Sequence, residues 1–125
     1  MPNRFLNHLG TNQINDMKKT KINIEVDLDE TNHPVAMEWS ATDSGMDGAK
    51  PCKGIMVSLW DGEEQCTYRI DLWNKGMMVE EMQHMMYETI RGMAETYEKA
   101  TGDDDITSQI NEFAEKFGKA SGVLK

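Results

Sequence analysis

The hydrophobic pattern of this chain changes its period once, at Gly76, and that change constrains the fold more than any other feature. Before Gly76, apolar and polar residues alternate through four segments, which is typical of half-buried β-strands. After Gly76, apolar residues recur every three or four positions, as on one face of an amphipathic helix. This order predicts an α+β domain, with a four-stranded antiparallel meander followed by two C-terminal helices packed on one face.

Turn-forming residues separate the four alternating segments. Residues 29–34 predict a turn between the first two strands, and Asp61-Gly62 predicts a tight turn between the last two. Residues 42–53 contain two glycines and a proline and predict a loop. The expected strands cover residues 22–28, 35–41, 55–60 and 66–73.

Two amphipathic helices are expected after the strands. The first covers residues 79–100, and Gly102 is placed to end it. Asp105 is predicted to cap the second helix. The inner face of the second helix is expected at Ile106, Ile110, Phe113 and Phe117.

Methionine is the unusual part of the composition, with 11 residues against 3 each of Phe, Trp and Tyr. Six methionines gather along the first helix, where their flexible thioethers are expected to fill the seam between the sheet and the second helix. An adaptable groove for hydrophobic segments is the alternative interpretation. These residues are Met77, Met78, Met82, Met85, Met86 and Met93.

The length of 125 residues suits one domain. Residues 20–120 are predicted to form this single α+β domain, and residues 121–125 a short tail. Residues 1–19 have a weakly basic charge and no clear period, which predicts a flexible leader. Met17 is an alternative candidate for the start of translation.

The charge of the chain excludes several partners. Asp and Glu number 22 against 13 Lys and Arg, a formal net charge of −9, which disfavours nucleic acid and anionic membrane surfaces. Because no apolar stretch reaches the length of a membrane span, we expect no direct membrane insertion. The N-terminal residues lack the apolar core of a signal peptide, so a cytoplasmic protein is expected.

Cys52 and Cys66 lack a metal-binding spacing, and a bridge between them is left open.

No motif in the sequence predicts catalysis, a cofactor or a bound metal. There is no nucleophile elbow, phosphate loop or dinucleotide fingerprint. Glu81-x-x-His84 matches only half of a carboxylate-bridged di-metal motif. Asp43–Gly48 resembles the start of a calcium loop but has Gly45 at its third position and lacks the closing glutamate. We therefore expect a non-enzymatic protein, while a small-molecule site would require a polar pocket.

One face of the predicted sheet carries an unusual pair of tryptophans. The face with Val57 and Ile70 is expected to lie under the helices, whereas the opposite face holds Trp60 and Trp73 among polar residues. Trp73 could shield the backbone near Gly54, or both rings could anchor a partner or a second copy. The candidate partner surface comprises Met56, Trp60, Arg69, Asp71 and Trp73.

Several segments resemble the gliding motility protein GldC family of Bacteroidetes over about residues 20–118. The resemblance lies in 39–43, 57–61, 68–77, 79–82 and 93–101, where Arg-Ile-Asp-Leu-Trp is followed by the methionine-rich helix. It implies an accessory component of the gliding apparatus, which is tied to protein secretion, with no catalytic motif. Protein partners from the gliding or secretion machinery are therefore expected, and homo-oligomerisation is left open. Met78, where the family tends to have proline, and Cys66 depart from its pattern.

A second hypothesis is a chaperone or export-associated binder of hydrophobic segments. Four strands followed by two helices are similar to the order in the export chaperone SecB, and methionine-rich faces suit varied ligands. This likeness concerns the order of elements alone.

Overall fold

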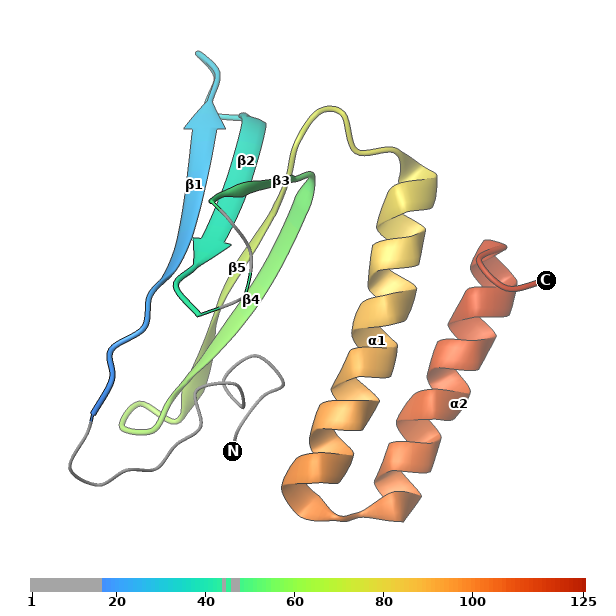
Figure 1. The fold of residues 1–125 in the computed structure, drawn as a ribbon. Coiled ribbons are helices and arrows are strands. Elements are labelled where there is room, and N and C mark those ends of the chain that lie inside the picture. The colour runs from blue at the N-terminus through green and yellow to red at the C-terminus, as the bar shows by residue number, and fades with distance from the viewer. Residues whose placement is uncertain (1–16, 44, 46–47) are drawn as a thin grey trace. The chain divides into compact units, whose positions relative to one another are not determined.

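The computed structural model describes residues 17–43, 45 and 48–125, which fall into a strand unit, residues 17–77, and a helical unit, Met78–Lys125 (Figure 1). Residues 1–16 of the predicted leader, with His8, and three residues of the calcium-like loop (Ser44, Met46 and Asp47) lie outside the described residues. The elements are β1 (Ile22–Leu28), β2 (Pro34–Ala41), β3 (Lys50–Cys52), β4 (Gly54–Asp61), β5 (Cys66–Trp73), α1 (Val79–Thr101) and α2 (Asp104–Ser121). The α+β class, the antiparallel strands and the two C-terminal helices are confirmed, and packing of the helices on one sheet face stays a prediction.

The prediction of one four-stranded meander is wrong. The strands form a three-stranded sheet in the order β1-β2-β3 and a two-stranded sheet of β4 and β5. The expected third strand, residues 55–60, corresponds to β4, which pairs with β5, whereas the additional strand β3 pairs with β2, and the strand structure is interrupted between β3 and β4 at Lys53. Pro51, which has no N–H, and Gly54, which has no side chain, flank this interruption and weaken a continuous ladder. Residues 50–52, predicted as loop, form the short edge strand β3.

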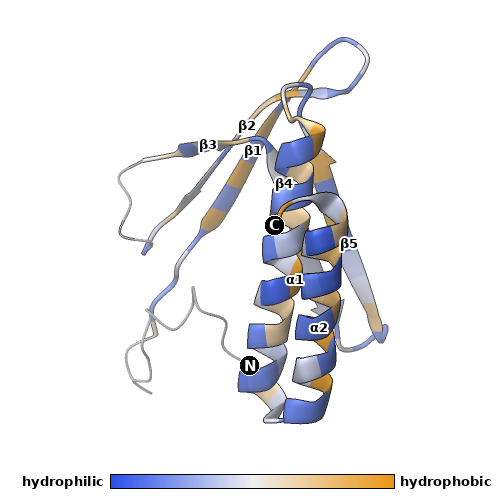
Figure 2. Ribbon diagram, turned by 90° about the vertical axis from the view of Figure 1, so that its right-hand side faces the viewer, coloured by the Kyte–Doolittle hydropathy of each residue, from blue (hydrophilic) through white to orange (hydrophobic). Residues whose placement is uncertain are grey.

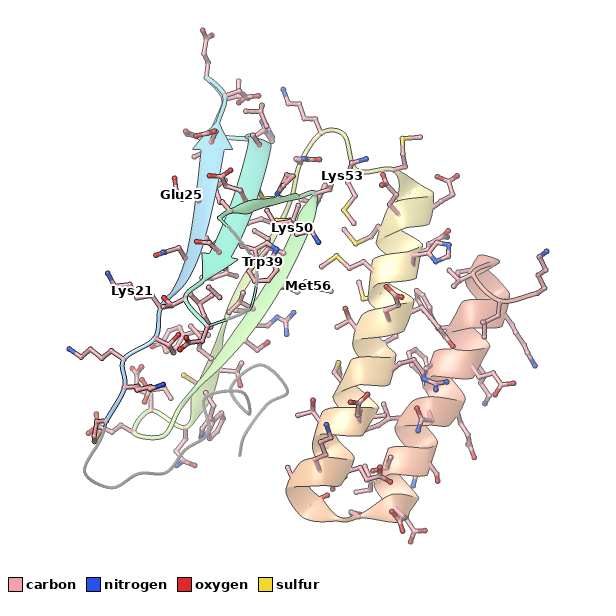
Figure 3. All side chains as sticks on the ribbon, viewed as in Figure 1. Lys21, Glu25, Trp39, Lys50, Lys53 and Met56 are labelled. Carbon is pink, nitrogen blue, oxygen red and sulfur yellow. The ribbon has the colours of Figure 1, made fainter. Side chains whose placement is uncertain are left out.

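The three-stranded sheet has one apolar and one acidic face, as the alternation requires. Its apolar cross-strand pairs are Ile22 with Ala41, Ile24 with Trp39 and Val26 with Met37. Met37 is 3% exposed and also lies opposite Cys52 of β3. Glu25 and Glu38 oppose each other on the other face. The alternation is visible as bands along the strands in Figure 2, and Glu25 and Trp39 are labelled in Figure 3.

The turn between β1 and β2 is organised around Asp29. Asp29 Oδ1 accepts hydrogen bonds from the Thr31 N–H at 2.8 Å, the Thr31 hydroxyl at 2.8 Å and the His33 N–H at 3.0 Å. Asp29 Oδ2 forms an ion pair with Lys75, which follows β5. The ammonium of Lys75, then these donors, hold the pKa of Asp29 well below its ordinary value. The turn is thereby tied to the end of the two-stranded sheet.

The helical unit is a pair of helices joined by Gly102 and Asp103. Gly102 ends α1 in the left-handed conformation, at φ 71°, and its N–H donates to the Glu98 carbonyl. The cap of α2 is Asp103, whose carboxylate accepts from the Ile106 N–H at 3.1 Å, so the prediction of Asp105 as the cap is wrong. Asp105 instead lies in the first helical turn.

Small residues are the ones that the two helices bury. They are Ala94 of α1 and Thr107, Ala114 and Gly118 of α2. Gly118 lies so close to Tyr87 of α1 that an added Cβ would come within 3.0 Å of its ring. The predicted inner face is wrong at Ile106 and Phe113, which are exposed. Helices that meet through small residues leave their large apolar side chains beside the contact rather than within it.

Candidate functional site

All five residues predicted for a partner surface lie on one face of the β4–β5 ribbon. The two strands pair without a register shift, so residues directly opposite each other share a face. Trp60 lies opposite Thr67, Arg69 opposite Ser58, Asp71 opposite Met56, and Trp73 opposite Gly54. The structure therefore brings Met56, Trp60, Arg69, Asp71 and Trp73 together on a single surface, which we call the tryptophan face.

The centre of the tryptophan face is a two-pronged pair between Arg69 and Asp71. Arg69 Nε donates to Asp71 Oδ2 at 3.0 Å, and Arg69 Nη2 donates to Asp71 Oδ1 at 2.9 Å. The remaining nitrogen, Nη1, donates to the Ser58 hydroxyl at 2.9 Å. The hydrogen bond and charge of Asp71 raise the pKa of the Arg69 guanidinium. This geometry fixes the positions of two opposite charges on an otherwise flat surface.

The two tryptophans flank this charged pair and are largely uncovered. Trp60 is 64% exposed and Trp73 is 58% exposed. Gly54, which lies opposite Trp73, has no side chain, so the indole has no cross-strand side-chain partner at this position. Large aromatic rings exposed around an arginine are typical of surfaces that bind other proteins.

A hollow of about 250 Å³ continues the tryptophan face beyond Trp73. Trp73, Asn74 and Lys75 line one side of it, while His33 and Pro34 come from the start of β2. The Asn74 N–H donates to the Lys53 carbonyl at 2.9 Å, which fixes the chain at this end of the ribbon. Sequence reasoning missed this hollow, because the contact between Asp29 and Lys75 joins segments that no local pattern connects.

The opposite face of the ribbon also exposes apolar residues. Leu59, Tyr68 and Ile70 are each about half exposed, although the alternation predicted that this face would be covered by the helices. The Tyr68 hydroxyl donates to the Glu64 carboxylate, and this bond raises the pKa of Tyr68. The strand unit itself therefore leaves both faces of the ribbon open at these positions.

The residues of the half di-metal motif have a structural role in the described chain. The Glu81 carboxylate accepts a hydrogen bond from the Met78 N–H at 2.9 Å, at the start of α1. His84 lies on the same helix and is exposed. Among the described residues, no three His, Cys, Asp or Glu side chains gather closely enough to hold a metal ion.

Both cysteines are free in the structure. Cys66 is exposed beside the turn end of the ribbon, opposite Asp61, whereas Cys52 is half-buried in β3. Burial raises the pKa of the Cys52 thiol. Cys52 precedes the Gly54 end of the ribbon and Cys66 lies at its turn end. The two residues are therefore on the order of 20 Å apart at the usual rise of a strand, which is too far for a disulfide.

None of the helices in the described chain is long and apolar enough to cross a lipid bilayer. A family model described as "Gliding motility-associated protein GldC-like" matches residues 34–122. The match runs from the start of β2 to the glycine that ends α2, and it contains the whole tryptophan face. No curated protein and no solved structure matches the chain.

Proposed function

This chain belongs to the GldC-like family of gliding motility-associated proteins, and from that premise we propose that it is a non-enzymatic accessory protein of the gliding apparatus. In this proposal it acts by protein–protein contact through the tryptophan face. The observation that carries the proposal is the exposure of Trp60 and Trp73 on either side of the Arg69–Asp71 pair.

The chemistry of the tryptophan face favours a protein partner. Tryptophan and arginine are the residues that most often dominate the binding energy of protein interfaces. Arg69 and Asp71 already form a hydrogen-bonded ion pair. A partner that covers them would therefore bury a pair of opposite charges rather than a single unpaired charge. The hollow beside Trp73 offers space for one side chain of the partner.

The same pair argues for contact rather than catalysis at this surface. A general acid or base needs a proton that it can exchange near the working pH. Arg69 is held in its charged form by Asp71, and both donors of the guanidinium fork are occupied by that carboxylate. Their fixed geometry suits recognition of a complementary polar group.

We place the partner among cytoplasm-facing components of the gliding or secretion machinery. The exposed thiol of Cys66 fits a reducing compartment, since disulfides form and persist mainly in oxidising ones. The acidic balance of the chain supports a protein partner rather than nucleic acid.

The experiment is complementation of gliding in a native host that lacks the gene. The double variant Trp60→Ala/Trp73→Ala should fold but fail to restore gliding, and crosslinking should no longer join it to the machinery. The matched control is Val35→Ala/Leu59→Ala, which removes exposed apolar groups of the strand unit that lie outside both the tryptophan face and β5. Full gliding with the tryptophan variant, at normal protein level, would refute the proposal.

A second candidate function is binding of hydrophobic segments, as in the chaperone-like hypothesis. It is favoured by the helical unit, which exposes Met78, Val79, Met93, Ile106 and Phe113. If this candidate is correct, the protein should suppress aggregation of several unrelated unfolded proteins. Met93→Ser/Phe113→Ser should weaken this suppression of aggregation, whereas Trp60→Ala/Trp73→Ala should leave it unchanged. This difference separates the two functions.

A further inference from the structure

The outer edge of β5 is an open strand edge. Within the described part of the chain, β4 is the only strand that pairs with β5. An unpaired edge presents a row of N–H and C=O groups that can pair with another strand, and proteins usually block such edges with proline, lysine or a bulge. Between Cys66 and Trp73 there is no proline and no lysine, and the ladder has no register shift.

The edge strand at the other end of the strand unit, β1, differs from β5 because its edge is protected. The edge strand β1 has an irregularity between Asp27 and Leu28 and carries Glu25 and Asp27 on its acidic face, with Glu38 beside them on β2. A second copy of β1 would bring further carboxylates to that face. By these standards β1 is protected against pairing, and β5 is not.

The charges on β5 select one register for pairing with a second β5. In an antiparallel pair of identical strands related by a two-fold axis, one residue must lie opposite its own copy, because opposite residues share a face. An axis at Arg69 or at Asp71 would oppose like charges. An axis at Ile70 places Arg69 opposite Asp71 of the second copy, and Asp71 opposite the second Arg69.

This register satisfies the other exposed side chains as well. Ile70, 47% exposed, meets its own copy, and Tyr68, 51% exposed, lies opposite Leu72 of the second copy. The two pairs of Arg69 and Asp71 then form a ring of four alternating charges on the tryptophan face. A two-stranded ribbon is only marginally stable in isolation, whereas a sheet of four strands, which pairing would produce, is more stable.

We propose that the chain forms a homodimer by antiparallel pairing of β5 with β5 of a second copy, centred on Ile70. The resulting sheet has the order β4-β5-β5-β4 and carries both tryptophan faces on one side. This inference does not rest on the proposed function, since a dimer can form whether or not the protein takes part in gliding.

The first test is the mass in solution, measured by light scattering and sedimentation velocity over a range of concentrations under reducing conditions. The full chain should be a dimer. Arg69→Asp and Asp71→Arg, each alone, should weaken the dimer by at least about tenfold, because like charges then face each other across the two-fold axis. A monomeric wild-type chain at tens of micromolar, or variants that dimerise as tightly as wild type, would overturn the proposal.

Mixing the two variants separates pairing between copies from pairing within one chain. Each variant has lost its internal Arg69–Asp71 pair, but one carries two carboxylates and the other two guanidinium groups at these positions. In the proposed register all four charges are complementary, so the mixture should form a heterodimer. A mixture that stays monomeric, with each variant folded by circular dichroism, contradicts the register.

A crosslink tests the same axis without changing charge. In a Cys52→Ser/Cys66→Ser background, Ile70→Cys should oxidise to a covalent dimer because each residue 70 faces its copy. Val57→Cys is the control: it lies opposite Ile70 on β4 and shares its face, but its two copies would be about 14 Å apart, at about 4.8 Å per strand. Equal crosslinking of both variants, or of neither, overturns the proposal.

Discussion

Glu25 and Glu38 lie directly opposite each other across β1 and β2, and both are exposed. Like charges in this arrangement destabilise a sheet, whereas opposite charges stabilise it. Glu38→Lys should therefore raise the free energy of unfolding by about 0.2–1 kcal/mol in urea titrations at low salt, and added salt should reduce the gain. Glu30→Lys is the control, because Glu30 is an exposed turn residue with the same change of charge but no strand partner. An equal gain from both variants would assign the effect to net charge.

The Asp103 cap can be tested against its neighbour Asp105. Asp103→Ala removes the acceptor for the Ile106 N–H and for the Tyr97 hydroxyl, which donates at 3.1 Å. The variant should lose about 1 kcal/mol of unfolding free energy. Asp105→Ala should change it by no more than about 0.5 kcal/mol. The reverse ranking in thermal or urea unfolding would return the cap to Asp105.

The two glycines inside the helices should respond in opposite directions to a larger side chain. In the described part of the chain, no atom beyond the neighbouring residues and the local helix backbone lies within 4 Å of a Cβ added at Gly92. Gly92→Ala should therefore stabilise the protein by about 0.5–1 kcal/mol through helix propensity. At Gly118 an added Cβ would come within 2.7 Å of Leu124 and 3.0 Å of Tyr87. Gly118→Val should therefore destabilise by about 1–3 kcal/mol. Urea unfolding of both variants measures the difference, and a stabilised Gly118→Val would contradict the close approach.

Asp29 should make stability depend on pH in the acid range. Its folded pKa is depressed, so its contribution is present above its ordinary pKa of 3.8 and is lost as the pH falls through the folded value. Compared with Asp29→Asn, the wild-type chain should be more stable near pH 6. The difference should shrink as the pH falls below about 3.8, because Asp29 then takes up a proton in the unfolded chain but stays ionised in the folded one. A difference that stays constant down to pH 2 would show that the charge of Asp29 contributes nothing.

The two cysteines should react with an alkylating reagent at different rates. Cys66 is exposed, whereas Cys52 is half-buried and burial raises its pKa, so less of it is thiolate at neutral pH. Mass spectrometry of a time course should show Cys66 modified first. In Cys66→Ser only the slow phase should remain; a fast phase in that variant would place Cys52 in a more open environment.

The sequence predicts the elements well where a periodic pattern decides them. Alternation assigns both the strands and the side of the ribbon on which Trp60 and Trp73 lie, because the pleat fixes the face of every second residue. It misses β3, since three residues that include Pro51 show no period. It also misplaces the α2 cap, because three consecutive aspartates are equally capable of capping and only the backbone geometry selects Asp103.

The remaining errors concern tertiary contacts. Apolar periodicity marks Ile106 and Phe113, but the helices bury Thr107, Ala114 and Gly118, which hydrophobicity alone does not identify. Arg69 and Asp71 can form their ion pair because residues two apart on one strand lie on the same face of the sheet. By contrast, the hollow beside Trp73 requires His33, which comes from a turn forty residues earlier in the chain.

Lys53 separates β3 from β4 by one residue, so two sheets share a single stretch of chain with no slack between them. Adding or deleting one residue here would reverse the alternation of side chains in β4 and β5 relative to β2. The residues on the two faces of the ribbon would then change places. Length variation among natural relatives should therefore be absent at this position. The single residue between the two strands thus fixes which face of the ribbon each side chain of β4 and β5 occupies.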